Sequence, residues 1–143
     1  DLLVAGPVNV ELWISSDAAD TDFTAKLIDV YPASEDYPEG FAMNISDGII
    51  RSRFRNSWQH PEQLNTGEVV KVEIKAFDCC NLFKKGHRIR LDISSSNFPH
   101  FDLNFNYADF SYQGQDEPRK ANNTVYAGGE YPSAIHLYIA DVN

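Results

Sequence analysis

The chain has 143 residues, a formal net charge of −9 and 43% hydrophobic residues. This length fits one domain, which can bury on the order of 70% of the surface that its unfolded form exposes. The acidic balance argues against nucleic acid and against an anionic membrane as partners, because both draw on clustered Lys and Arg, and no apolar run approaches the ~20 residues that span a bilayer.

The chain starts with DLLVAGPV, which resembles a linker running into a strand and leaves open a longer parent protein. Residues 7–16 then alternate between apolar and polar side chains, which predicts the first strand. Trp13 lies on the polar side of this strand, so either a second layer covers it or another molecule docks there. Residues 23–31 predict the next strand, and the acidic, proline-punctuated segment 32–40 predicts a surface loop.

Asp47 and Gly48 are typical of a hairpin turn, so we expect two short strands over residues 41–45 and 49–55. Arg51, Arg53 and Arg55 would then share one face of the second strand. This row of cations either is solvated or pairs with acidic residues of a neighbouring strand or domain. In the paired case, at least one guanidinium should lie within salt-bridge reach of Asp20 or Asp22.

Residues 69–77 alternate again and predict a strand. Cys79 and Cys80 follow directly, and because a disulfide between neighbours would be strained, we expect free thiols. The chain therefore has no disulfide framework. This is compatible with a reducing compartment and also with a large-cored secreted protein, and it favours a cytoplasmic location only slightly.

The most informative stretch is residues 86–104 (GHRIRLDISSSNFPHFDLN). After Gly86, apolar residues 89, 91 and 93 alternate with charged residues 88, 90 and 92, as in a half-buried strand. Residues 94–97 can hydrogen-bond the backbone where the chain leaves the sheet. Phe98 and Phe101 flank Pro99, which predicts a loop fixed by aromatic side chains.

Residues 107–123 show no sustained period and predict a long irregular loop, whereas residues 124–127 and 135–140 predict closing strands. About eight strands, with no amphipathic helix, predict an all-β antiparallel β-sandwich, and a jelly roll is the expected topology.

Catalytic and metal motifs are missing from the sequence. No G-x-S-x-G elbow and no zinc motif occurs, and His87 at the start of a strand is expected to be a hydrogen-bonded structural residue. Asp17, Asp20 and Asp22 could supply oxygen ligands to calcium, but turn formation and pairing with the arginines is the favoured alternative. We expect a structural polar network that consists of Asp20, Asp22, Arg51, Arg53, His87, Arg88, Ser95 and Asn97.

Four blocks of the sequence resemble, in order and spacing, the C-terminal domain of the CocE/NonD hydrolases, which include X-Pro dipeptidyl-peptidases, cocaine esterase and α-amino-acid ester hydrolases. The blocks are GPVNVELWISSDAADTDFTAKLIDVYP, DGIIRSRFR, FKKGHRIRLDISSSNFPHFDLN and NNTVYAGGEYPSAIHL. The resemblance covers nearly the whole chain and implies one jelly-roll, galactose-binding-like domain over residues 1–143. The chain departs from the family pattern at residues 104–108 and at Tyr138.

In that family the serine, acid and histidine of catalysis belong to an upstream α/β-hydrolase domain, which this chain does not contain. The resemblance therefore implies an accessory domain with no catalytic residues and no cofactor. Its expected partners are the hydrolase domain of the same parent protein or a homo-oligomer partner. It would pack on the hydrolase and help to shape its substrate cleft, through an exposed apolar surface that includes Trp13, Phe98, Pro99 and Phe101.

The alternative from another functional class is a free-standing module that binds carbohydrate or a protein partner through exposed aromatic residues. The aromatic candidates for sugar stacking are Trp13, Trp58, Tyr107, Tyr112, Tyr126 and Tyr131. A hydrolase pattern with G-x-S-x-G upstream of Asp1 would favour the accessory domain, and a short start sequence would favour the module.

Overall fold

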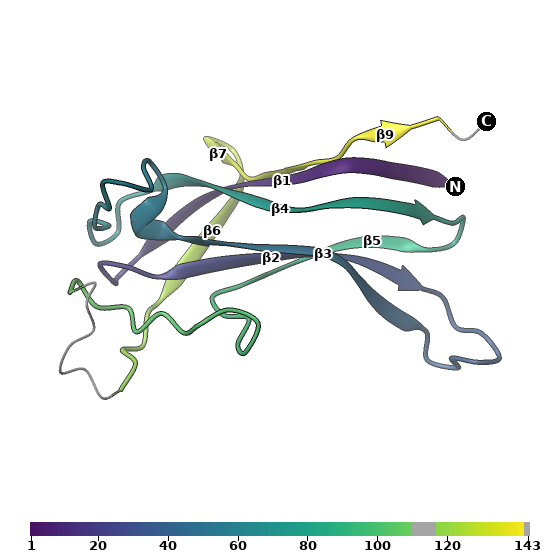
Figure 1. The fold of residues 1–143 in the computed structure, drawn as a ribbon, viewed down its shortest axis with the longest axis horizontal. Coiled ribbons are helices and arrows are strands. Elements are labelled where there is room, and N and C mark those ends of the chain that lie inside the picture. Colours follow the sequence, from purple (N-terminus) through teal and green to yellow (C-terminus); the bar gives the residue numbers. More distant parts are fainter. Residues whose placement is uncertain (110–116, 142–143) are drawn as a thin grey trace.

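The computed structural model describes residues 1–109 and 117–141 (Figure 1). Within these ranges the strands are β1 (Leu2–Ser16), β2 (Asp22–Tyr31), β3 (Phe41–Arg51), β4 (Val70–Phe83), β5 (Arg88–Ser94), β6 (Asn123–Gly128), β7 (Tyr131–Pro132), β8 (Ala134–His136) and β9 (Ile139–Ala140). One short 3-10 helix, η1 (Ser52–Phe54), follows β3. Across the described ranges, no helix is long and apolar enough to cross a membrane.

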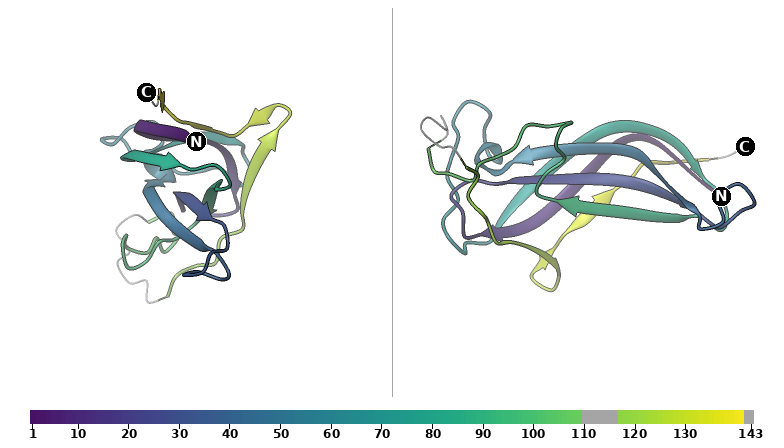
Figure 2. Two further views of the ribbon diagram at one scale, coloured as in Figure 1. Left: turned by 90° about the vertical axis from the view of Figure 1, so that its right-hand side faces the viewer. Right: turned by 90° about the horizontal axis from the view of Figure 1, so that it is seen from below.

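The strands form two antiparallel sheets that face each other (Figure 2). The larger sheet has the order β4-β1-β6-β7, and β8 and β9 also pair with β1. The smaller sheet has the order β3-β2-β5. This arrangement confirms the all-β antiparallel sandwich, while the jelly-roll topology stays a prediction.

Strand β1 organises the larger sheet because all its other strands except β7 pair with it. Its residues 8, 10, 12 and 14 point inward, and Val10 and Ile14 are fully buried, as the alternation predicts. The register with β4 shifts by one residue between Gly6 and Val8. Pro7, which has no backbone N–H for the ladder, lies at this shift.

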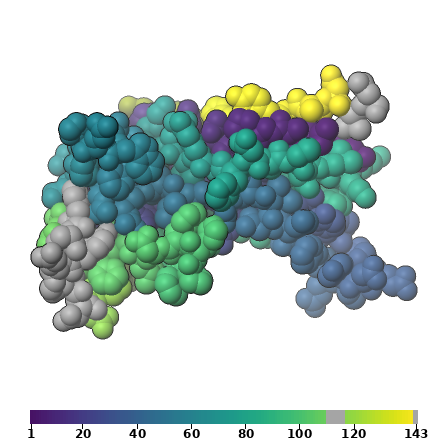
Figure 3. Space-filling view, viewed as in Figure 1, coloured from purple at the N-terminus to yellow at the C-terminus, as the bar shows by residue number. Residues whose placement is uncertain are grey.

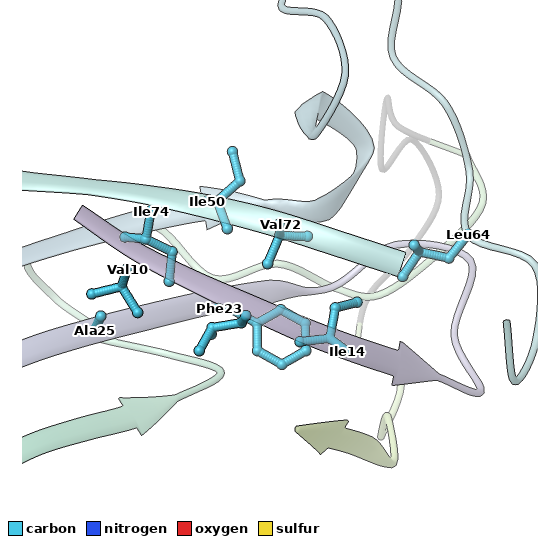
Figure 4. Packing of buried hydrophobic residues seen from close by; sticks show 9 residues of the cluster. Val10, Ile14, Phe23, Ala25, Ile50, Leu64, Val72 and Ile74 are labelled. Atoms are coloured by element: carbon cyan, nitrogen blue, oxygen red, sulfur yellow. The ribbon is translucent and has the colours of Figure 1, made fainter. Parts of the chain in front are cut away.

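Two groups of buried side chains fill the space between the sheets, and Figure 4 shows the larger one. The larger group contains Val10, Leu12, Ile14, Phe23, Ala25, Ile50, Leu64, Val72 and Ile74. The smaller group contains Val4, Val8, Leu27, Cys79 and Phe83. Full burial of a large apolar side chain contributes about 1.5–3 kcal/mol, so this interior is the main source of stability.

The hairpin expected at Asp47 and Gly48 is wrong, because β3 runs through both residues without a turn. A Cβ atom on Gly48 would lie 2.8 Å from Cα of Ala76 and 2.9 Å from the carbonyl oxygen of Lys75, both on β4. The glycine is therefore needed for close contact between the sheets. The hairpin joins β2 to β3 instead, and its exposed loop of residues 32–40 projects from the body (Figure 3).

Several strand boundaries also differ from the expectation. The predicted strand 49–55 ends at Arg51, where η1 follows, and the predicted strand 69–77 continues to Phe83. Both cysteines therefore lie in β4, where they are free thiols as expected, and burial raises the pKa of Cys79. The closing strand 135–140 divides into β8 and β9. The predicted irregular loop 107–123 lies partly outside the described residues, and β6 begins at its last position.

Candidate domain interface

A buried acid–arginine cluster joins the turn after β1 to η1. Asp20 is completely buried and accepts hydrogen bonds from Ser52 Oγ (3.0 Å), the backbone N–H of Arg53 (3.1 Å) and Asn104 Nδ2 (3.0 Å). The guanidinium of Arg53 lies 3.3 Å from the same carboxylate. Burial raises the pKa of Asp20, against the opposing effects of Asn104 and Arg53.

Asp22, the first residue of β2, is the second acid of this cluster. Arg51, directly opposite it on β3, binds it in a bidentate manner with distances of 2.9 and 3.0 Å. Asn104 Nδ2 donates to Asp22 Oδ1 at 2.7 Å and so joins both acids. The expectation that an arginine reaches Asp20 or Asp22 is confirmed twice.

The shared strand face expected for the three arginines is wrong. Arg51 ends β3, Arg53 lies in η1, and Arg55 follows it. Because the chain turns here, each guanidinium goes to a different partner: Arg55 donates to the carbonyl oxygens of Ser52 and Glu62.

The three calcium candidates are engaged in these and other contacts. Asp17 accepts hydrogen bonds from the backbone and the side chain of Asn122 (2.8 and 2.6 Å), whereas Asp20 and Asp22 face arginines. The part of the chain that the structure describes contains no group of three acidic, histidine or cysteine side chains arranged to hold a metal ion.

His87 belongs to a second buried polar group, at the other end of the sandwich. Its Nδ1 lies 2.8 Å from Oδ1 of Asp29, which is fully buried on β2 and also accepts a hydrogen bond from Asn81 of β4. The ring also packs on Tyr31, with centroids 4.2 Å apart. His87 is therefore a hydrogen-bonded structural residue. Arg88 is exposed and makes no side-chain ion pair with the described residues, so it stands outside the expected network.

The segment after β5 crosses the outer face of the smaller sheet (Figure 1). Ser95 Oγ accepts a hydrogen bond from Asn123 (2.8 Å), Asn97 donates to Asp47 (3.2 Å), and Asp102 pairs with Arg51 (3.3 Å). Ser95 and Asn97 are thus hydrogen-bonded to β6 and β3, and these contacts do not link them directly to the acid–arginine cluster. They attach a segment without regular structure to β3 and β6.

The same segment completes an exposed apolar surface. Phe54 and Trp58 stack with centroids 5.3 Å apart, and Trp58 is 74% exposed. Together with Phe101 they form a groove of about 200 Å³, called here the aromatic groove, which is lined by Ile49, Arg51, Phe54, Trp58, Phe101 and Asp102. Phe98 is 65% exposed, and Pro99 is exposed as well.

Trp13 lies apart from this groove. It points outward from β1 on the larger sheet, where it is half-buried and packs on Tyr131 with centroids 5.3 Å apart. Tyr126 completes this aromatic cluster. The two sheets stand between Trp13 and the loop of Phe98, Pro99 and Phe101, so the four expected interface residues do not form one patch. Tyr112, a candidate for sugar stacking, lies outside the described residues.

Sequence reasoning missed Asn104, Asp29 and Phe54. Asn104 is separated by 82 residues from Asp22, and Asp29 by 58 residues from His87. No local pattern links residues so far apart. The only signal for Asn104 was its position at the start of the run that departs from the family pattern.

Comparison with known proteins places the chain in a family. Residues 1–136 match the model of the X-Pro dipeptidyl-peptidase C-terminal non-catalytic domain. The chain therefore belongs to this family of non-catalytic domains, as the four sequence blocks indicated.

Three relatives show the similarity in detail. The chain is 42% identical over 137 residues to the cocaine esterase of Rhodococcus sp. (strain MB1 Bresler). It also resembles the structures of an α-amino acid ester hydrolase (TM-score 0.90, 30% identity) and an aminopeptidase from a marine sediment Thaumarchaeota archaeon (TM-score 0.89, 30% identity). These matches cover 95%, 97% and 98% of this chain, but only 23%, 24% and 24% of the relatives. The chain thus spans about a quarter of their length.

Proposed function

We propose that this chain is the accessory domain of a serine hydrolase and that residues 1–143 form one unit that packs on the hydrolase domain of the same polypeptide. The match to a family of non-catalytic domains carries this proposal. The relatives at 30% identity or more include two ester hydrolases and one aminopeptidase, each about four times as long as the chain. The parent reaction is hydrolysis of an ester, amide or peptide bond through an acyl-enzyme.

The aromatic groove is the surface through which the domain meets the hydrolase. Trp58, which lines the groove, exposes more than half of its surface in the isolated chain, and so does Phe98 in the loop that supplies Phe101; this exposure costs free energy unless a partner covers them. A groove with aromatic walls and one charged pair at its rim resembles the composition of protein interfaces, where aromatic residues and Arg are enriched. Homo-oligomer contacts through the same groove are the competing use.

Turnover assays test the accessory role. The 143-residue chain should hydrolyse neither p-nitrophenyl esters nor Xaa-Pro anilides, whereas the complete hydrolase should hydrolyse at least one of them. The substrate that is turned over separates an esterase from a dipeptidyl-peptidase. Sustained turnover by the isolated chain that is lost in Ser95→Ala or His87→Ala would overturn the proposal.

Variants in the groove test the docking surface. In the complete hydrolase, Trp58→Glu should lower the melting temperature or kcat/KM, because a charge would be placed against the partner. Phe77→Glu is the matched control, since Phe77 is 64% exposed on β4, away from the groove. Equal behaviour of the two variants would exclude the groove as the interface. Sedimentation of the isolated chain at several concentrations measures self-association.

A further inference from the structure

The inner face of the sandwich is not fully covered on the side of β5. Ile89 lies opposite Asp29 in the ladder between β5 and β2, and cross-strand partners share a face of the sheet. Asp29 points inward and is fully buried, but Ile89 is 44% exposed. Strand β5 therefore directs an apolar side chain inward at a place where the described residues cover it only in part.

The larger sheet shows the same feature on this side. Val125 of β6 lies opposite Ile14, which is fully buried in the core. Val125 is nevertheless 40% exposed. Leu91 and Ile93, the next inward residues of β5, pack against the core but are only half-buried. Apolar side chains from both sheets are thus only partly buried along the margin of the sandwich where the ribbons of β5 and β6 lie (Figure 2, right).

Strand β5 also has a free edge. In the described residues it pairs only with β2, so every second N–H and C=O group of β5 points away from its sheet. Unpaired backbone groups along an edge strand are a template for a further strand. The free edge lies on the same side of the sandwich as β6, with Ile89 near one end of β5 and Val125 beyond its other end. An added strand that runs along the whole of β5 could therefore reach both side chains.

The charge at this edge is opposite to that of the whole chain. Lys84, Lys85 and Arg88 are exposed, and none of them has an acidic partner within 4.0 Å in the described part of the chain. Arg90 pairs only with Asp92 of its own strand, at 3.0 Å. Four of the twelve Lys and Arg residues thus lie within seven positions of a chain with net charge −9. This local cationic surface favours an acidic partner.

We propose that an extended strand of the hydrolase polypeptide, outside residues 1–143, adds to the free edge of β5. Its inward side chains are apolar and pack against Ile89 and Val125, and its outward side chains are acidic and face Arg88. This inference rests on the proposed function, because it takes the strand from the hydrolase, but it concerns a different surface from the aromatic groove.

Hydrogen exchange of the backbone amides tests the added strand. Amides that point outward from a free edge exchange quickly, and they are protected once a neighbouring strand accepts their hydrogen bonds. We expect the outward-pointing amides among residues 88–94 to exchange at least ten times more slowly in the complete hydrolase than in the isolated chain. The same comparison with Ile89→Lys or Val125→Lys should show a loss of most of this protection, whereas Met43→Lys, at 43% exposure on β3, should keep it.

The possible failures are distinguishable. A parent polypeptide without a hydrolase domain would overturn this inference and the proposed function together. A hydrolase in which residues 88–94 exchange as fast as in the isolated chain would overturn the added strand alone. Protection that arises in the isolated chain as its concentration is raised would assign the edge to a second copy and would also overturn it.

Discussion

Along one side of the sandwich, β3 approaches β4 so closely that Gly48 leaves no room for a methyl group, whereas along the other side β5 leaves Ile89 44% exposed. We call these the closed side and the open side. Both β3 and β5 pair with the same central strand, β2. The comparison teaches that an alternating sequence determines which face of a strand points inward, while the opposite sheet determines whether that face is covered.

The buried acid–arginine cluster lies where β3 of the closed side passes into η1, and breaking it should have the largest effect. We expect Asp20→Ala to lower the free energy of unfolding by about 3–5 kcal/mol, because the buried guanidinium of Arg53 would lose the carboxylate that lies 3.3 Å from it. Ser52 and Asn104 would lose an acceptor as well. Urea denaturation of the isolated chain measures the change.

Asp102→Ala is the matched control for this prediction. Asp102 pairs with Arg51 at 3.3 Å, but its side chain is 79% exposed. An exposed ion pair contributes about 0–1 kcal/mol, so this variant should remain close to the wild type. Similar losses in the two variants would show that burial does not distinguish the cluster from a surface ion pair.

The sequence was sufficient to predict the strands whose alternation is regular and whose partners impose nothing unusual. The inward residues of β1 and β5 and the surface loop of residues 32–40 are confirmed. The pairing of Arg51 and Arg53 with Asp22 and Asp20 is confirmed too. Opposite charges were expected to pair because the chain has few cations to neutralise its acids.

The features that the sequence did not reveal depend on contacts between distant segments. Gly48 is typical of a turn, but in the fold it leaves room for the backbone of β4. The contact is with Lys75, which lies 27 residues further along the chain. Asn104 reads as a loop residue, but it bridges two buried acids. The exposure of Ile89 could not be predicted either, because the period of a strand does not tell whether the opposite sheet covers its inward side chains.

A second prediction compares the two sides by adding one carbon to each. Gly48→Ala would place Cβ 2.8 Å from Cα of Ala76, a backbone atom that cannot rotate away, so the sheets would have to separate. Overpacking of this kind costs about 1–3 kcal/mol. Val125→Ile adds a carbon on the open side, where Val125 is 40% exposed, and should change stability by less than about 0.5 kcal/mol. Thermal melts of both variants would contradict the comparison if their losses were equal.

The smallest expected effect is on the pH dependence of stability, and it concerns two acids of one turn, Asp17 and Asp20, which have different hydrogen-bond donors. Hydrogen bonds from the backbone and side chain of Asn122, which precedes β6, lower the pKa of Asp17 from 3.8. Burial raises the pKa of Asp20, which faces η1 at the end of β3. A carboxyl group with a lowered pKa stabilises the fold above its unfolded pKa and loses that contribution as the pH falls through the folded value. A carboxyl group with a raised pKa loses its contribution as the pH rises from the unfolded to the folded value.

These signs predict opposite changes in the pH dependence of stability. Below about pH 5, Asp17→Asn should lose less stability on acidification than the wild type, because the group that favours the ionised state is gone. Asp20→Asn should lose more, because the group that favours the protonated fold is gone. The effect of Asp17→Asn should be a small fraction of that of Asp20→Ala, since Asp17 is more exposed. Melting temperatures between pH 3 and pH 7, with Glu39→Gln in the exposed loop as control, measure both slopes. Changes of the same sign in the two variants would contradict the opposite pKa shifts of Asp17 and Asp20.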